Sequence, residues 1–370
     1  MAELGLRIVI RYGLLERPHR YMTSDPVLHH RARANTITRV GGAEFSTNSL
    51  ALRDREYSGP KPAGVFRMLM LGDSFTEGSG LPLEQTVARR VESALNLRGC
   101  GRYEVVNAGV ASYSPILEYL QLQRLAPVLQ PDLVVLNFDM TDVHDDVVRT
   151  ATATLDARGL PVAVPGDAII ETSLLLPPLS GWLRPVSPWL NRLAIFQAFR
   201  KSLAGVWLFG PYRVSPELIE AHRLYGDLVH DPVAITRDPD YPELARGWAL
   251  TERYLLGIRD QARARRIPFV LVVYPHGQQV SPLESIGGRR QLGASHGLYA
   301  SERPFKRLEE LGKREGFPVV NLLALFRAEH AKGLLFRGHD IHHTSFGASV
   351  FADGVLSGLL AVRALPACSR

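Results

Sequence analysis

Short apolar segments of strand length alternate with longer segments that have helical spacing, and this alternation limits the fold more than any other feature. The strand-like segments lie at residues 65–71, 103–107, 133–138, 268–274 and 318–321. The helix-like segments lie between them, at 83–98, 116–128, 245–266 and 302–315. Strands that alternate with helices form parallel, doubly wound α/β sheets. The sequence therefore predicts an α/β fold with a doubly wound, mostly parallel sheet.

In such sheets the functional site lies at the carboxyl ends of the strands. Ser74, Gly109 and Thr141 each follow the end of a predicted strand, and PHGQQ (275–279) follows another. Because parallel strands end at one edge of the sheet, we expect these residues to meet there.

Ser74, in LMLGDSFTEGSG (69–80), is the best candidate for a catalytic nucleophile. It lies at a strand-to-helix turn, where backbone N–H groups without helical partners favour developing negative charge. Gly, Asp and Ser also favour ordinary turns, so these residues alone leave both interpretations open.

A serine nucleophile needs a base, and the base needs an acid that orients it. Asp340, His342 and His343 share a polar loop, GHDIHHTSFG (338–347), ahead of an apolar helix-like segment. An acid so near an imidazole can fix its tautomer and stabilise the imidazolium. A solvated loop and a metal site are the alternatives. Because the chain has no cysteine cluster or HExxH motif, we expect no metal and no cofactor.

Ordered blocks of the chain resemble those of the SGNH or GDSL hydrolases. They are GDSFTEGSG (72–80), VVNAGVASYS (105–114), PDLVVLNFDMTD (131–142) and DIHHTSFG (340–347). The segment STNSLALRDREY (46–57) is also similar to the lead-in of bacterial members. The resemblance covers roughly residues 44–145 and 255–362. It implies a flavodoxin-like α/β fold and a Ser-His-Asp mechanism acting on acyl esters.

By this resemblance Ser74 is the nucleophile, His342 the base and Asp340 the acid that orients the base. His342 is followed by Thr344 and Gly347 at the spacing found in the family. His343 fits the other spacing found there, three residues after the acid, so it stays an alternative to His342.

The resemblance also implies an oxyanion hole made by the N–H groups of Ser74 and Gly109 and by one side chain. In the family that side chain is an asparagine, whereas this sequence has Thr141. A threonine hydroxyl can donate one hydrogen bond, and Asn137 on the preceding strand is the alternative donor. Since one donor is typically worth roughly 100–1000-fold in rate, the substitution predicts a weaker catalyst.

The chain divides into an N-terminal extension at 1–60, a hydrolase-like core at 61–149 and 246–370, and a helical insertion or cap at 150–245. The insertion is too long for a connection and too apolar for a disordered linker. Trp182, Trp189 and Trp207 recur in it at roughly helical spacing. They either pack the cap onto the core or bind substrate, and basic residues among them are compatible with peripheral membrane contact.

The composition of the chain limits the kinds of partner that it can bind. The net charge is +6, and no block of Lys and Arg or nucleic-acid motif is present, so nucleic acid is not an expected partner. No apolar stretch is long enough to span a membrane, and residues 1–20 do not read as a signal peptide. The compartment stays open between the cytoplasm and, if the start is truncated, an anchored or periplasmic location. Two cysteines allow a disulfide without establishing one.

We therefore predict a serine esterase or acyltransferase whose substrate is a small-molecule or glycan acyl ester, with O-acylated carbohydrate as first choice. A lipid-ester hydrolase is the second choice. A catalytically weak module that binds acylated glycans is the alternative from another class. The sequence does not indicate the oligomeric state.

Overall fold

A five-stranded parallel sheet forms the centre of the computed structural model, which describes residues 21–57, 61–166, 221, 223–224, 230–294 and 296–368. Its strands are β5 (Val65–Gly72), β6 (Arg102–Gly109), β7 (Leu133–Phe138), β10 (Phe269–Val273) and β11 (Val319–Asn321). They lie in the order β11-β10-β7-β5-β6, and every neighbouring pair is parallel. This is the flavodoxin-like order, in which the winding reverses between β5 and β7. The predicted fold class is confirmed.

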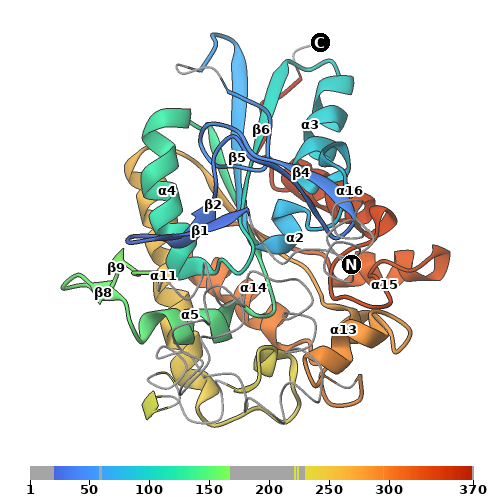
Figure 1. The fold of residues 1–370 in the computed structure, drawn as a ribbon. Helices are drawn as coiled ribbons and strands as arrows, with labels where there is room; N and C mark the ends of the chain where they lie inside the picture. Colours follow the sequence, from blue (N-terminus) through green and yellow to red (C-terminus); the bar gives the residue numbers. More distant parts are fainter. Residues whose placement is uncertain are drawn as a thin grey trace, which may run out of the picture.

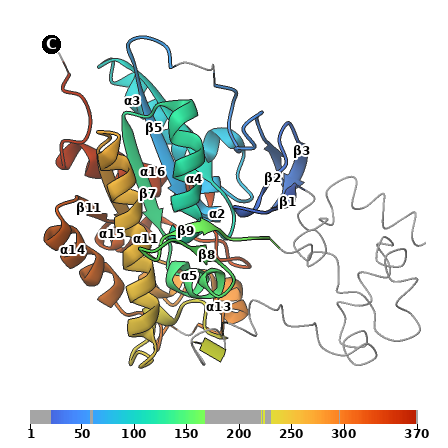
Figure 2. The same cartoon turned by 90° about the vertical axis from the view of Figure 1, so that its left-hand side faces the viewer.

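Helices cover both faces of this sheet (Figure 1). One layer consists of α4 (Pro115–Leu129), α11 (Leu244–Ala264) and α14 (Arg303–Glu315), which lie together in Figure 2. The other consists of α3 (Val87–Leu97), α15 (Leu323–Glu329) and α16 (Ser345–Ala361). The shorter elements are α2 (Ser74–Glu77), α5 (Asp142–Thr150), α12 (Gly277–Val280), α13 (Ile286–Gln291) and the 3₁₀ turns Leu83–Gln85, Ala234–Thr236 and His330–Lys332.

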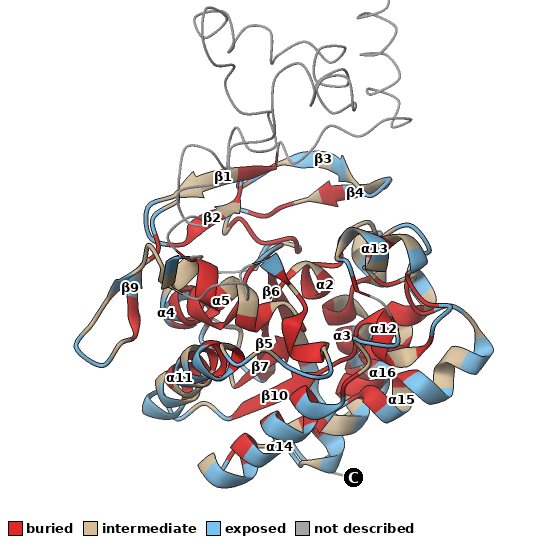
Figure 3. Cartoon of the chain, turned by 90° about the horizontal axis from the view of Figure 1, so that it is seen from below, coloured by how far each residue is buried: buried red, intermediate tan, exposed pale blue. Residues whose placement is uncertain are grey.

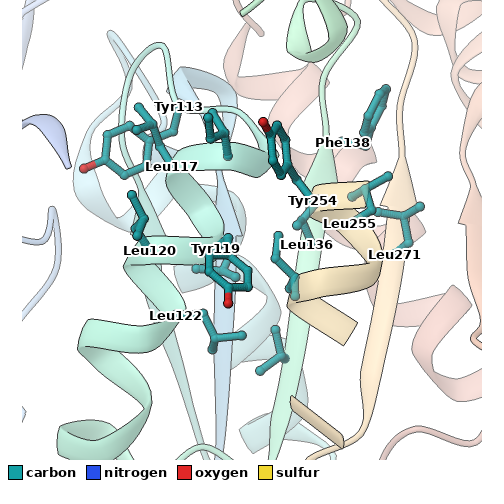
Figure 4. Packing of buried hydrophobic residues seen from close by; sticks show 14 of the residues in the cluster. Tyr113, Leu117, Tyr119, Leu120, Leu122, Leu136, Phe138, Tyr254, Leu255 and Leu271 are labelled. Carbon is teal, nitrogen blue, oxygen red and sulfur yellow. The ribbon is translucent and has the colours of Figure 1, made fainter. Parts of the chain in front are cut away.

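The central strands supply both hydrophobic layers because their side chains alternate between the faces. Leu69 and Leu71 of β5 belong to the cluster beneath α4 and α11, whereas Met68 and Met70 belong to the cluster beneath α3 and α16. Figure 4 shows the first cluster, with Leu136 from β7 between α4 and α11 side chains. β7 and β10 are buried along their whole length (Figure 3), which explains their continuous apolar sequences.

The N-terminal part of the described chain forms two short antiparallel hairpins beside the core. They pair β1 (Met22–Asp25) with β2 (His29–Ala32), and β3 (Ile37–Val40) with β4 (Ala43–Ser46). A third small pair, β8 (Thr154–Leu155) with β9 (Pro161–Ala163), follows α5. The polar segment after β4 then contacts β6, where the side chain of Asp54 accepts a hydrogen bond from the backbone N–H of Asn107 at 2.7 Å.

Cys100 and Cys368 form a disulfide, with Cα atoms 4.8 Å apart. It joins the turn before β6 to the C-terminal tail, at the amino end of the sheet and therefore opposite the strand ends. Among the helices that the structure describes, none has the length and apolarity needed to cross a membrane.

Candidate active site

Ser74, His342 and Asp340 form a continuous hydrogen-bonded chain at the carboxyl edge of the sheet. His342 Nε2 lies 2.9 Å from Ser74 Oγ. His342 Nδ1 lies 2.8 Å from both carboxylate oxygens of Asp340. With Nδ1–H donating to the carboxylate, Nε2 is left as an acceptor for the serine proton. All three side chains keep some solvent exposure, so a substrate can reach them.

Ser74 is held at the first position of a single helical turn, α2. The preceding residue, Asp73, caps this turn by accepting the backbone N–H of Phe75 at 2.9 Å. The turn ends at Gly78, which adopts the left-handed conformation that glycine tolerates best (φ 81°). The chain thus changes from strand to helix at the nucleophile, as the sequence predicts.

The pKa of the Asp340 carboxyl group is lowered. Burial alone would raise the pKa of Asp340, but hydrogen bonds and charge from His342, the backbone N–H of Ile341 and the nearby Arg337 lower it to about 2. The loop that carries Asp340 is also held by a residue from another part of the chain. The hydroxyl of Ser285 donates to the backbone carbonyl of Asp340 at 2.7 Å.

His343 has a different environment from His342. Its ring is buried among Phe75, Phe336 and Phe351, with ring centroids 4.9, 4.9 and 5.4 Å away. Burial, followed by the charge of His342, lowers the pKa of His343 well below its usual range. His343 is therefore a neutral histidine of the core, and the structure places His342 against the serine.

The backbone N–H of Gly109, a predicted oxyanion donor, donates to the side-chain oxygen of Asn107 at 3.1 Å. Its role toward a substrate oxygen stays a prediction. The lack of a side chain at Gly109 has another cause: a Cβ there would collide with the backbone of Thr76 and Glu77 in α2. The glycine allows β6 to approach the turn that carries the nucleophile.

Thr141 and Asn137 are likewise engaged by protein groups. The Thr141 hydroxyl donates to Asp139 at 2.7 Å, and its backbone N–H donates to the same oxygen at 2.8 Å. The Asn137 amide donates to the hydroxyl of Thr76 at 2.9 Å. The oxyanion role predicted for Thr141, or alternatively for Asn137, stays a prediction.

Beneath Ser74, His342 and Asp340 lies a buried polar network that no motif in the sequence indicates. The Tyr274 hydroxyl lies 2.8 Å from Asp139 and 3.1 Å from Asp73, and His276 Nε2 lies 2.7 Å from Asp139. A tyrosine hydroxyl has one proton and cannot donate to both carboxylates. Burial and the charge of Asp139 raise the pKa of Asp73 well above its usual range, which favours its neutral form.

Asp139 is the ionised member of this network. Burial opposes its charge, but His276, through charge and a hydrogen bond, and Thr141 hold the pKa of Asp139 below its usual range. The only sequence signal for His276 was its place after the fourth strand, in PHGQQ. Tyr274 had none, because it ends an apolar segment like any core aromatic.

Two further predictions concern the tryptophans and a metal. Trp182, Trp189 and Trp207 lie outside the described residues, so their relation to Ser74 stays a prediction. Within the described ranges, no group of three or more His, Cys, Asp or Glu side chains is arranged to hold a metal ion.

Neither the protein-family models nor the curated protein sequences match this chain. Solved structures do. A GDSL-like lipase from Bacteroides thetaiotaomicron is 13% identical with a TM-score of 0.34, over 81% of this chain and 89% of that one. A lipase/acylhydrolase from Enterococcus faecalis is 12% identical with a TM-score of 0.38, over 80% and 96%. An acetyl xylan esterase is 14% identical with a TM-score of 0.39, over 80% and 100%. Similarities this low identify neither activity nor substrate.

Proposed function

We propose that this protein is a serine esterase or acyltransferase of the SGNH type, in which Ser74 carries the acyl group. The observation that supports this best is the chain of hydrogen bonds from Ser74 Oγ through His342 to Asp340. A serine, an imidazole and an ionised carboxylate in this order can activate the hydroxyl as a nucleophile. The motif resemblance points to the same chemistry.

In the first half of the reaction, Ser74 Oγ attacks the ester carbonyl and its proton passes to His342 Nε2. Asp340 stabilises the resulting imidazolium and keeps the ring in place. When the tetrahedral intermediate collapses, the bond to the alcohol breaks and the departing oxygen takes the proton from His342. A water molecule or a second alcohol then attacks the seryl ester, with His342 again as base. Water gives hydrolysis and an alcohol gives acyl transfer.

The oxyanion needs more than one hydrogen-bond donor. The Ser74 N–H, at the start of α2, is one. Backbone N–H groups in and after the end of β6 are engaged in turn: Gly109 by Asn107, Val110 by Gly72, Ala111 by Glu77 and Tyr113 by Val110. Among the described residues, the N–H groups of Ser112 and Ser114 show no acceptor. Ser114 is fully buried, whereas Ser112 is exposed and left-handed (φ 61°). We assign the second donor to the Ser112 N–H.

The substrate class rests on the resemblance. An O-acylated carbohydrate is the first choice and a lipid ester the second. A non-catalytic module that binds acylated glycans is favoured by one observation, the engagement of Gly109, Thr141 and Asn137 by protein groups. Such a module does not require the aligned triad, whereas an esterase does.

Labelling with a fluorophosphonate separates these functions, because only an activated serine reacts. We expect one label per chain, found on Ser74 by peptide mass spectrometry and absent from Ser74→Ala. An inert wild-type protein with native circular dichroism would overturn the esterase. A series of p-nitrophenyl esters of increasing chain length, read as kcat/KM, then distinguishes a short-acyl from a lipid-type enzyme.

A further inference from the structure

Arg337 begins the loop that carries the acid and base of the triad. Phe336 and His343 pair across the base of this loop as an antiparallel bridge. Inside that bridge, the Arg337 N–H donates to the carbonyl of His342 at 2.9 Å. The backbone of Arg337 is thus fixed to the residue that acts as base, and its side chain starts from a defined position.

The guanidinium of Arg337 lies between the triad acid and the nucleophile turn. Nη1 is 3.6 Å from Asp340 Oδ2, and Nη2 donates to the carbonyl of Ser79 at 2.9 Å. The N–H of Ser79 in turn donates to the carbonyl of Ser74 at 3.0 Å. One planar group therefore joins the carboxylate that orients the base to the backbone that positions the nucleophile.

Two glycines make room for this guanidinium. A Cβ at Gly80 would occupy the space of the Arg337 guanidinium itself. A Cβ at Gly41, in the hairpin between β3 and β4, would collide with Gly80 and crowd Nη1 at 3.1 Å. The side chain of Arg337 is only 13% exposed. The surrounding backbone therefore fixes the position of the Arg337 guanidinium. A surface arginine differs in this respect, because its ion pairs contribute little to stability.

Arg53 offers an internal comparison on the same turn. Its buried guanidinium donates to the carbonyls of Glu77 at 3.0 Å and of Glu44 at 3.1 Å, and also to those of Gly78 and Leu81. Arg53 thus binds the turn through carbonyls, and none of its hydrogen bonds reaches a triad side chain. Arg337 shares the turn but adds the contact with Asp340.

We infer that Arg337 is a positioning residue that couples the nucleophile turn to the triad acid, so that Ser74, His342 and Asp340 keep their alignment. The inference rests on the proposed esterase function. It predicts that Arg337 acts on the rate of the chemical step through Asp340, with little effect on substrate binding.

A double-mutant cycle on the full chain tests this coupling, with p-nitrophenyl acetate hydrolysis as the assay. Arg337→Gln should lower kcat roughly 10-fold, with KM unchanged within about two-fold. Arg337→Lys, which keeps the charge but loses the planar fork, should recover part of that loss. In an Asp340→Asn background, Arg337→Gln should lower kcat less than about two-fold further, because residues that act as a unit are not additive.

Arg314→Gln is the matched control, since Arg314 lies on α14 and pairs with Glu252 and Glu315 at the surface. It should leave kcat unchanged, and thermal unfolding should show that every variant is folded. Equal losses from Arg337→Gln in both backgrounds, a KM effect alone, or no loss would overturn the inference while wild-type activity stands. A wild-type protein that neither hydrolyses the ester nor reacts with a fluorophosphonate would overturn the proposed function, and the inference with it.

Discussion

At one edge of the sheet, the pKa of Asp340 and the pKa values of the carboxyl groups buried behind it are shifted in opposite directions. The Asp340 side chain is 27% exposed and ionised, and its pKa is lowered to about 2. Glu118 and Asp142 lie fully buried near the same strand ends, and burial raises the pKa of each well above its usual range. Neither Glu118 oxygen has a hydrogen-bond partner in the described part of the chain.

The difference shows that the neighbouring groups, more than depth, set the direction in which the pKa of each acid moves. Asp139 is as buried as Glu118, yet it stays ionised because His276 lies against it. Asp340 likewise has His342 and Arg337 beside it, and both lower its pKa. The neighbouring groups that act on Glu118 and Asp142 are other carboxylates, which raise the pKa of each and favour the neutral form that is less costly to bury.

The largest expected effect separates the two adjacent histidines. His342→Phe should lower kcat/KM roughly 1000-fold or more, because Ser74 loses its base. His343→Phe should keep activity within a few fold, because the neutral ring of His343 packs among aromatic side chains. Steady-state kinetics with p-nitrophenyl acetate measures both. If His343→Phe were the inactive variant and His342→Phe the active one, the assigned base would be wrong.

The next effect separates the two ionised acids. Asp139→Asn should destabilise the fold by about 3–5 kcal/mol, because it breaks a buried pair and leaves His276 without its partner. Asp340→Asn should cost little stability while lowering kcat at least about 100-fold, through loss of the oriented base. Urea unfolding and kinetics on both variants test this division. A stable Asp139→Asn variant would contradict the account of the buried pair.

A smaller effect concerns Asp146, a buried acid that accepts hydrogen bonds from Thr251 and Ile116. Burial raises the pKa of Asp146 to about 7, above its ordinary value of 3.8. Between about pH 4 and 7 the unfolded chain therefore releases this proton while the folded chain keeps it. The stability that this retained proton contributes to the folded state is fully present below about pH 4. It falls as the pH rises through this window and is lost above about pH 7.

Asp146→Asn removes this dependence while keeping the acceptor for Ile116 and a polar group opposite Thr251. The variant should gain stability relative to wild type as the pH rises from 4 to 8, by at most about 4 kcal/mol. Urea unfolding at several pH values gives the slope of the unfolding free energy against pH for the wild type and for the variant. Identical slopes for variant and wild type would show that Asp146 is ionised in the folded protein.

The smallest effect on the site should come from the disulfide. Because Cys100 and Cys368 lie at the amino end of the sheet, reduction should leave kcat unchanged while lowering the melting temperature by a few degrees. Cys368→Ser should reproduce the melting temperature of the reduced protein. A fall in kcat on reduction would mean that the two ends of the sheet are coupled.

The strands, the layered helices and the residues that meet in the hydrogen-bonded chain of Ser74, His342 and Asp340 could be predicted because their signals are local. Continuous apolar runs mark β7 and β10, and Ser74 and Asp340 lie in short motifs at strand ends or loops. The oxyanion donors could not be predicted in the same way. Whether the Gly109 N–H is free depends on how the Asn107 side chain turns back on its own backbone, and residue identity does not encode this.

Long-range contacts account for most of what was missed. Arg337 and Ser79 are 258 residues apart in sequence, and no spacing rule connects them. The N-terminal hairpins were not predicted because their strands are only four residues long. The β2 sequence (HHRA) also lacks the alternation of apolar and polar residues that marks a half-buried strand. His276 and Asp139 became recognisable as a pair only once β7 and β10 were adjacent.

The link between Cys100 and Cys368 also determines what a cut in the backbone would do. Ser74 lies before Cys100, whereas Asp340 and His342 lie before Cys368. A single peptide-bond cleavage between Cys100 and Asp340 would put the nucleophile and its base on different polypeptides. The sulfur–sulfur bond would still hold those two polypeptides together. The nicked protein would run as one species on a non-reducing gel and as two after reduction, with its triad assembled from both pieces.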